Sequence, residues 1–470
     1  MVFDSFAYLA FLLLAWAGAV LLRKRSATAW LVLASYFFYS LAAWWYPLLL
    51  LGVSAAAWFC GNAARGAGNG PRRKLAAGIG IALTLAPLLA FKYGVQWLAA
   101  GRGAGIWQDP QPWVMPLGLS FYALQAIAWL VDCARGDIAE RPPLMRFLLF
   151  FSFFPKLSAG PILRHDDFFS ASRRAALDSN VLWNAALLFT HGVFKKVVIA
   201  DNAALAANAL FAAPETTGPL ALFGVLAYSM QIYCDFAGYT DMALASGLLL
   251  GIRLPRNFHW PYLATNPAEF WRRWHITLSH WLRDYVYLAL PGIRRRRALP
   301  VYGGLLLTML VCGLWHGSTL PFAVWGLYWG VLMLAYRLLQ PRLERLWHAA
   351  ILPEWALTVA AVAMMQALTA AGWIFFRAES LSQAGRVFAS IAGGGWVLTA
   401  SAALTEQQLL VAILLTGFWL FQWKALHAPL LHNLEARPWH PAGVAWVLLL
   451  LSLAAVFRVP NAVPFLYFRF

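Results

Sequence analysis

The stretch Ala298–Tyr336 reads ALPVYGGLLLTMLVCGLWHGSTLPFAVWGLYWGVLMLAY, 39 residues without an aspartate, glutamate, lysine or arginine. A helix needs about 20 apolar residues to cross a bilayer, so this stretch is long enough for two crossings with a hinge near Pro321. A backbone in hydrocarbon must satisfy its own amides, which a helix does within one segment. The stretch therefore predicts a pair of membrane-spanning helices.

Similar uncharged runs recur along the chain of 470 residues, which is 61% hydrophobic and only 12% charged. Soluble domains carry about 25% charged residues. The other runs are Phe6–Leu22, Ser26–Ala64 (hinged near Pro47), Leu75–Phe91, Pro110–Val131, Ser179–Phe194, Thr216–Cys234, Trp355–Phe376, Gln407–Trp423 and Pro438–Phe457. We predict an all-α polytopic membrane protein of about 11 transmembrane helices, forming a single integral domain over residues 1–470.

The net charge of +17 lies in clusters between the apolar runs rather than over one surface. The clusters are Arg23–Arg25, Arg72–Lys74, Arg294–Arg297, and Arg337 with Arg342 and Arg345. The positive-inside rule predicts that such loops are cytoplasmic. The basic excess therefore marks membrane topology, and no nucleic-acid partner is expected.

The four cysteines, Cys60, Cys133, Cys234 and Cys312, have no paired spacing and adjoin or lie within apolar sequence. Neither a disulfide framework nor a metal site is predicted from them. The chain also lacks a G-x-S-x-G elbow and a P-loop. Catalysis by a serine or cysteine nucleophile and ATP-driven transport are therefore not expected, and any catalysis would depend on histidine.

Polar groups enter the apolar sequence at Gln231–Asp241. Asp241 follows Asp235 by six residues, about 240° of helical rotation, so the two carboxylates would not share a helix face. Gly238 between them suggests a helix break that lines a cavity. The alternative is that these groups form hydrogen bonds between helices.

The segment Glu269–Tyr285 has the pattern of one amphipathic helix rich in tryptophan and arginine, typical of an interfacial or re-entrant element. Its apolar stripe contains one histidine, His275, whereas Arg272 and Arg273 fall elsewhere. A histidine on an apolar face is usually a core residue with a hydrogen-bond partner, and a functional role for His275 is the alternative.

His316 is the strongest single candidate, because no acidic or basic residue other than histidine lies within 18 positions on either side. Glycines flank this part of the run, and glycine admits close approach of a substrate or backbone. Imidazole has a near-neutral pKa that suits a general base. A structural hydrogen bond between helices remains the alternative.

At these residues the chain resembles the membrane-bound O-acyltransferases, and within them the bacterial branch that acetylates alginate and transfers D-alanine to teichoic acids. Ten segments carry the resemblance in order: Met1–Ser5, Pro116–Phe121, Phe154–Ile162, Phe194–Asn202, Gln231–Asp241, Asn257–Tyr262, Phe270–Tyr287, Leu314–Gly317, Gly372–Ala378 and Pro464–Phe468. The resemblance implies a ring of helices, with re-entrant elements, around a central conduit.

The resemblance also implies roles for single residues. His316, in Leu-Trp-His-Gly, corresponds to the essential histidine of the family, and His275, in Arg-Arg-Trp-His, to a second, supporting one. Candidates for the conduit or the donor site are Gln231, Asp235, Trp315, Arg272 and Arg273.

The implied function is transfer of acetyl groups from a cytoplasmic donor, acetyl-CoA, across the bacterial inner membrane for O-acetylation of a secreted exopolysaccharide, with alginate preferred. Cellulose or another exopolysaccharide, D-alanyl transfer to teichoic acid, and a lipid or protein acceptor are alternatives. A non-enzymatic transporter is an alternative of a different class. The implied partners are acetyl-CoA, periplasmic acetyltransferase proteins, the polysaccharide, directly or indirectly, and membrane lipid. No bound cofactor is expected.

Overall fold

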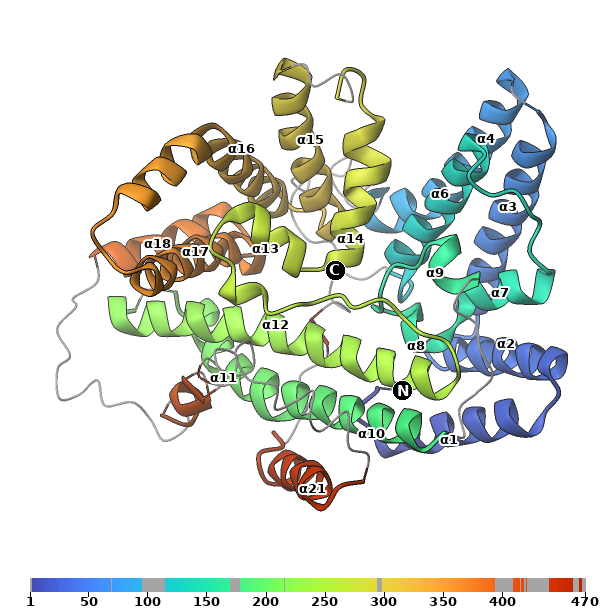
Figure 1. Ribbon diagram of the computed structural model, residues 1–470, viewed down its shortest axis with the longest axis horizontal. Coiled ribbons are helices and arrows are strands. Elements are labelled where there is room, and N and C mark those ends of the chain that lie inside the picture. The colour runs from blue at the N-terminus through green and yellow to red at the C-terminus, as the bar shows by residue number, and fades with distance from the viewer. Residues whose placement is uncertain are drawn as a thin grey trace. The chain divides into compact units, whose positions relative to one another are not determined.

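The computed structural model describes residues 2–68, 70–94, 115–169, 178–214, 216–293, 298–393, 409–414, 416–417, 420, 439–459 and 465–466 (Figure 1). Within these ranges every regular element is a helix, which confirms the predicted all-α class. The cluster Arg294–Arg297, part of Gln407–Trp423 and the start of Pro110–Val131 lie outside them.

The chain divides into two compact units, of which the first comprises Met1–Val193, Gly238–Arg256 and Leu434–Ser452. Its helices are α1 (Phe6–Leu21), α2 (Lys24–Ser40), α3 (Tyr46–Gly66), α4 (Pro71–Leu89), α6 (Leu119–Arg135), α7 (Leu144–Ser152), α8 (Phe154–Leu157), α9 (His165–Phe169), α10 (Ser179–Val193) and most of α21 (Pro441–Val456). Helices α3, α4 and α6 pack together, and the indole of Trp129 on α6 donates a 3.0 Å hydrogen bond to the carbonyl of Ala57 on α3.

The second unit comprises Phe194–Ala237, Asn257–Asn433 and Leu453–Phe470, and it contains both predicted histidines. Its α-helices are α11 (Asp201–Ala212), α13 (Pro267–Arg273), α14 (Ile276–Trp281), α15 (Ala298–His316), α16 (Leu320–Ala349), α17 (Glu354–Arg377) and α18 (Leu381–Gly393). Short turns of other helix types are η2 (Phe194–Ala200), η3 (Pro261–Leu263), η4 (Leu282–Val286) and η5 (Tyr287–Ala289). The long α12 (Gly218–Leu249) belongs to both units.

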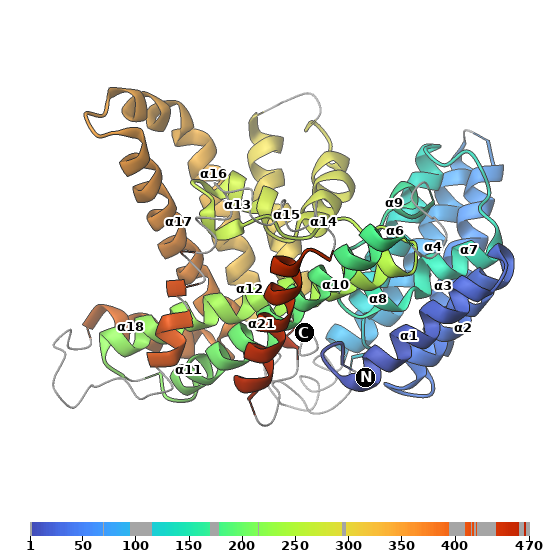
Figure 2. The same cartoon turned by 60° about the horizontal axis from the view of Figure 1, so that its bottom comes forward.

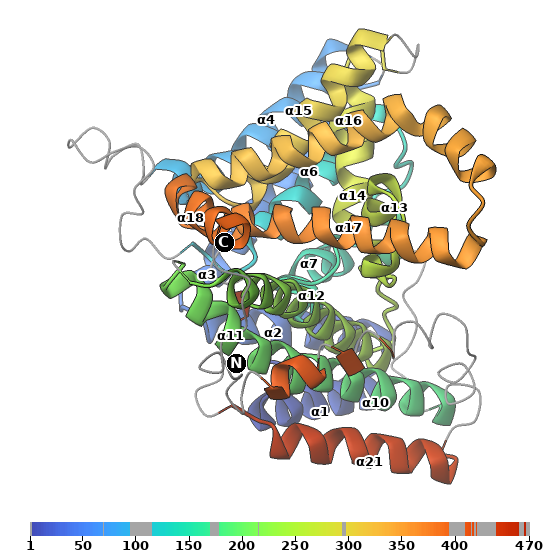
Figure 3. The same cartoon turned by 90° about the vertical axis from the view of Figure 1, so that its left-hand side faces the viewer.

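Helices α15 and α16 form a tight pair, and α17 packs against α16 (Figures 2 and 3). A Cβ atom on Gly313 of α15 would lie 2.2 Å from the carbonyl oxygen of Phe322, and one on Gly326 of α16 would lie 2.4 Å from that of Met309. The two backbones therefore touch where both residues lack a side chain, which is the usual way in which small residues join helices in membranes.

The membrane class is confirmed by the lengths of the described helices. Six are long and apolar enough to cross a bilayer: Tyr46–Gly66, Pro71–Gly94, Gly218–Leu249, Leu299–His316, Leu320–Ala349 and Glu354–Arg377. Two shorter apolar helices are Phe6–Leu21 and Pro441–Val456. The total of about 11 crossings and the single domain over residues 1–470 stay predictions.

Both predicted hinges are confirmed. Helix α3 begins at Tyr46 with Pro47 in its first turn, and α16 begins at Leu320 with Pro321 in its first turn. Proline is tolerated in a first turn because the amide hydrogen that it lacks has no helical acceptor at that position. Each long uncharged run is therefore two helices with a proline just after the break.

The predicted helix break at Gly238 is wrong, because α12 continues through this residue as a helix of 32 residues. A glycine inside a helix costs only about 1 kcal/mol relative to alanine, which packing readily offsets. Helix α10 passes close by, since a Cβ on its Gly192 would lie 2.7 Å from the carbonyl oxygen of Gly238. Gly238 therefore lies at a close helix contact.

A single methyl group at Gly313 is expected to force α15 and α16 apart. Gly313→Ala should lower the free energy of unfolding by about 1–3 kcal/mol, seen as a lower melting temperature of the detergent-solubilised protein. Gly303→Ala on the same helix is the matched control, because nothing lies within 4 Å of a Cβ at that position. An unchanged melting temperature in Gly313→Ala would contradict the backbone contact.

Candidate active site

The predicted single helix over 269–285 is wrong, because the chain breaks at Trp274 and His275 between α13 and α14. His275 has a left-handed backbone with φ of 41°, a conformation that residues other than glycine seldom adopt. A second segment supplies the hydrogen bonds that the break exposes. The amide of His259 donates to the carbonyl of Arg273, and the amide of Ile276 donates to the carbonyl of Asn257, both at 2.9 Å.

His275 is completely buried, with 0% of its surface exposed. Its Nδ1 lies 3.2 Å from Oδ1 of Asn257, and its ring packs edge-to-face on Phe236 of α12, with ring centroids 4.8 Å apart. Burial lowers the pKa of the His275 imidazole to about 3, because a charged ring loses its hydration. The side chain is therefore neutral at physiological pH.

His316 is the last residue of α15 and is 3% exposed. Three aromatic rings pack against its imidazole: Trp315 at 4.8 Å, Trp325 of α16 at 5.2 Å and Phe376 of α17 at 5.1 Å between centroids. All three contacts are edge-to-face, an arrangement that aromatic rings favour. Three successive helices thus hold this imidazole in an apolar setting.

Trp315 brings the two predicted histidines into one site. Its ring centroid lies 6.1 Å from that of His275 and 4.8 Å from that of His316. The contact requires both the break between α13 and α14 and the end of α15. The structure therefore groups His275 and His316 around the indole of Trp315, a third predicted site residue.

A hydrogen-bonded cluster next to Trp325 holds the aromatic rings around His316 in place. Trp373 of α17 stacks on Trp325 with centroids 6.0 Å apart, and its indole nitrogen donates to the Tyr262 hydroxyl at 3.1 Å. That hydroxyl donates in turn to the backbone carbonyl of Ser229 on α12. Gln366 of α17 donates to the backbone carbonyl of Tyr262 at 2.6 Å. Helices α12, α16 and α17 are thereby tied together beside His316.

Asp235 forms part of a buried ion cluster. Lys196 of η2 lies between two carboxylates, 2.7 Å from Asp235 and 2.8 Å from Asp201. Burial lowers the pKa of Lys196, but the two carboxylates outweigh that effect and raise it above its ordinary value. The second Asp235 oxygen accepts the Leu466 amide at 2.9 Å, and the Lys196 nitrogen lies 4.5 Å from the Phe465 ring centre. Asp235 therefore bonds to residues of other elements. This was the alternative, in the sequence analysis, to a helix break that lines a cavity.

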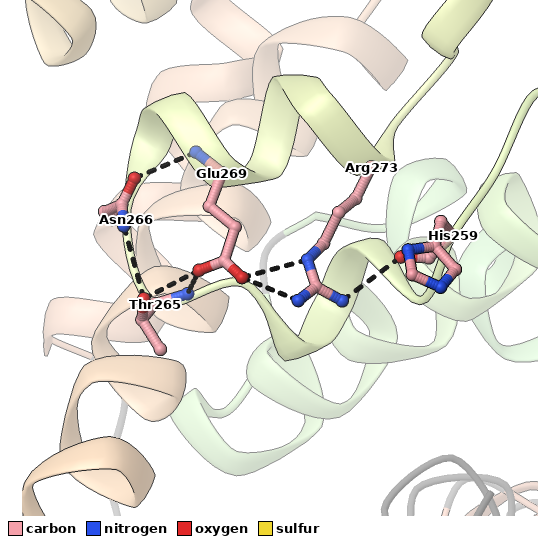
Figure 4. A network of polar contacts seen from close by, with 5 residues as sticks. All are labelled: His259, Thr265, Asn266, Glu269 and Arg273. Carbon is pink, nitrogen blue, oxygen red and sulfur yellow. Dashed lines mark hydrogen bonds and ion pairs between the residues drawn. The ribbon is translucent and has the colours of Figure 1, made fainter. Parts of the chain in front are cut away.

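Arg273 belongs to a network that holds α13 at both ends (Figure 4). Its guanidinium donates to Oε1 of Glu269 at 2.6 and 3.0 Å and to the carbonyl of His259 at 3.3 Å. Glu269 also accepts from Thr265, and Asn266 caps the helix by accepting the Glu269 amide at 2.8 Å. Burial raises the pKa of Glu269, but these hydrogen bonds outweigh it and hold the pKa below its ordinary value.

The remaining predicted candidates differ in exposure. Arg272 is exposed, so its charge is accessible from outside the protein. Gln231 on α12 is buried, and its side-chain oxygen has no hydrogen-bond partner among the described residues.

Sequence reasoning did not single out Asn257, Lys196 or the Trp325 and Phe376 rings. Lys196 could have been found, because a carboxylate predicted at membrane depth needs a cationic partner. Asn257 lies in a segment noted only for the resemblance, and nothing in its spacing from His275 indicates their contact. The rings are indistinguishable by sequence from the other aromatic residues in apolar helices.

Comparison with known proteins decides the class. The profile of the membrane-bound O-acyltransferase family (MBOAT) matches residues 134–350, which include both histidines. The "Probable alginate O-acetylase AlgI" of Pseudomonas putida is 34% identical over 501 residues, covering 100% of both chains. The chain belongs to the membrane-bound O-acyltransferase family.

Other relatives of this O-acyltransferase bear related names. The "Peptidoglycan O-acetyltransferase" of Helicobacter pylori is 34% identical over 77% of this chain and 73% of its own length. The "Teichoic acid D-alanyltransferase" of Bacillus subtilis is 35% identical over 48% of this chain and 62% of its own. The protein is thus a multi-pass membrane enzyme with bacterial relatives, and a non-enzymatic transporter is excluded.

The buried ion cluster is expected to tolerate complete neutralisation better than loss of its cation. Lys196→Met leaves two buried carboxylates uncompensated and should cost about 3–5 kcal/mol of stability. The triple variant Lys196→Met, Asp201→Asn, Asp235→Asn should recover much of that loss. Melting temperature and membrane abundance measure both. A triple variant less stable than Lys196→Met would contradict the ion cluster.

Proposed function

We propose that this enzyme transfers acetyl groups from acetyl-CoA on the cytoplasmic side to serve O-acetylation of a secreted exopolysaccharide, with alginate as the first polymer. The observation that carries the proposal is the pairing of buried His316 and His275 around Trp315 in an apolar setting. Two imidazoles so placed are suited to moving the proton that an acceptor hydroxyl must lose.

His316 would act as the general base. An acceptor hydroxyl attacks the thioester carbonyl carbon of acetyl-CoA while the imidazole of His316 takes the proton of that hydroxyl. The tetrahedral intermediate then collapses, the carbon–sulfur bond breaks, and the imidazolium returns the proton to the leaving thiolate. The products are the acetyl ester and CoA thiol. The apolar rings of Trp325 and Phe376 exclude water, which would otherwise compete as an acceptor.

Alginate comes first because the named alginate O-acetylase matches over its full length, whereas the named D-alanyltransferase of Bacillus subtilis matches over 48% of this chain. Transfer through periplasmic acetyltransferase proteins would deliver the group to the polymer. D-alanyl transfer is the second candidate, favoured by the match to those enzymes.

His316→Ala should abolish acetyl transfer, with a loss of at least about 10²-fold. Wild-type and variant membranes, matched for enzyme abundance by immunoblot, would receive radiolabelled acetyl-CoA. The readouts are release of CoA thiol and acetyl content of the polymer made by the complemented deletion strain.

Full acetyl content in His316→Ala would contradict the assignment of the base. Polymer that lacks acetyl groups but gains or loses D-alanine with the enzyme would contradict the acetyl donor and favour the second candidate. Parallel analysis of alginate, cellulose and total exopolysaccharide identifies the polymer.

Arg272 is proposed to attract the phosphates of the donor, because it is exposed on the helix that leads to His275. Arg272→Ala should raise KM for acetyl-CoA by about tenfold, the value of one charge-assisted hydrogen bond, and leave kcat nearly unchanged. The effect should shrink at high salt. Arg386→Ala, which removes an exposed arginine of α18, is the control. An equal change in both variants would contradict a donor site at Arg272.

A further inference from the structure

Asn257 contacts the chain break at His275 with both its backbone and its side chain. Its backbone carbonyl accepts the amide of Ile276 at 2.9 Å, and its side-chain oxygen accepts the amide of Thr277 at 3.2 Å. The hydroxyl of Thr277 also donates to that oxygen at 2.8 Å. Asn257 is 1% exposed, so each of these bonds forms away from solvent. Asn257 therefore holds the C-terminal side of the left-handed turn at His275, while His259 bonds to Arg273 on the N-terminal side.

These contacts identify which side-chain atom of Asn257 is the oxygen. A backbone amide can only donate, so the atom that faces the Thr277 amide must be the acceptor. The same oxygen lies 3.2 Å from Nδ1 of His275. An acceptor on one side of this contact requires a donor on the other, so Nδ1 of His275 must bear a hydrogen.

The protonation of the ring follows from its surroundings. His275 is buried against the uncharged rings of Phe236 from α12 and Trp315 from α15. Burial disfavours the charged imidazolium. A neutral imidazole that bears its hydrogen on Nδ1 has a lone pair on Nε2, and it cannot donate a hydrogen bond from that atom.

We infer that Asn257 is a positioning residue that fixes His275 in the Nδ1–H tautomer, so that Nε2 of His275 acts as an acceptor toward the reacting groups. The inference rests on the proposed function for the identity of those groups. It excludes neutral His275 as a hydrogen-bond donor to the oxyanion, and it assigns to His275 the orientation of the acceptor hydroxyl beside His316.

The side-chain nitrogen of Asn257 adds a second consequence. This buried donor has no hydrogen-bond partner among the described residues. A buried donor without a partner is costly and is usually retained for a ligand or a bound water. The same carboxamide thus contacts His275 with its oxygen and keeps its nitrogen as a donor for a ligand or a bound water.

The tautomer can be measured without any acyl donor. Solid-state ¹⁵N spectra of histidine-labelled wild-type enzyme in lipid, with His275 assigned by loss of its signals in His275→Gln, distinguish a protonated Nδ1 from a protonated Nε2. We expect Nδ1–H in the wild type and a shift toward Nε2–H in Asn257→Leu. A wild-type His275 protonated on Nε2 overturns the inference.

The pH profile of acetyl transfer gives a second, functional readout. In Asn257→Asp the new carboxylate accepts the same amide but favours imidazolium, so the pKa of His275 rises. Because protonated Nε2 no longer accepts, the acidic limb of kcat should move upward by at least about one pH unit. Asn257→Leu should lower kcat about 10²-fold with little change in KM for acetyl-CoA.

Asn202→Leu is the matched control, because Asn202 is also buried but its amide donates only to backbone carbonyls in the bonds observed. It should reduce abundance without moving the pH profile. If both Asn257 variants kept the wild-type kcat and pH profile, the inference would be overturned and the proposed function would be unaffected. Absence of acetyl transfer in the wild type would instead contradict the proposed function, while the ¹⁵N measurement still decides the tautomer.

Discussion

A backbone amide in an apolar medium must find a partner, and this constraint governs how the chain can break beside its buried histidines. Between α13 and α14 the helical ladder stops, and the amides and carbonyls on each side bond instead to Asn257 and His259. Without that second segment, the left-handed conformation of His275 would have no compensation. The break in turn brings His275 to Trp315, so the composition of the site depends on backbone bonds made by Arg273 and Ile276, on either side of His275.

Close helix packing supplies the other half of the site. Gly313 and Gly326 allow α15 and α16 to meet backbone to backbone. Trp325 is the residue before Gly326, and its ring contacts that of His316. The hydrogen bond from Trp373 to Tyr262 then ties α17 to the segment that begins at Asn257. Both histidines are thus held by one connected set of contacts within the second unit.

The sequence was sufficient where the deciding property is local. Apolar run length predicts the helices, and Pro47 and Pro321 predict where long runs divide. Prediction from the sequence failed where contacts with distant residues decide the structure. Helix α12 stays helical through Gly238. The predicted helix over 269–285 is interrupted at His275, whose side chain contacts Asn257, 18 residues earlier in the chain. The pairing of Lys196 with Asp235 spans 39 residues. Helical periodicity predicts neither a contact between separate elements nor a left-handed residue, such as His275, that another segment stabilises.

The bond from Leu466 to Asp235 joins residues 231 positions apart, which has a consequence for biosynthesis. Ribosomal synthesis delivers Lys196, Asp201 and Asp235 to the membrane long before Leu466 emerges. The early helices must therefore be inserted with one acceptor site of Asp235 still open, and water or the insertion machinery must occupy it meanwhile. The polar centre is therefore complete only after the segment around Leu466 has been made.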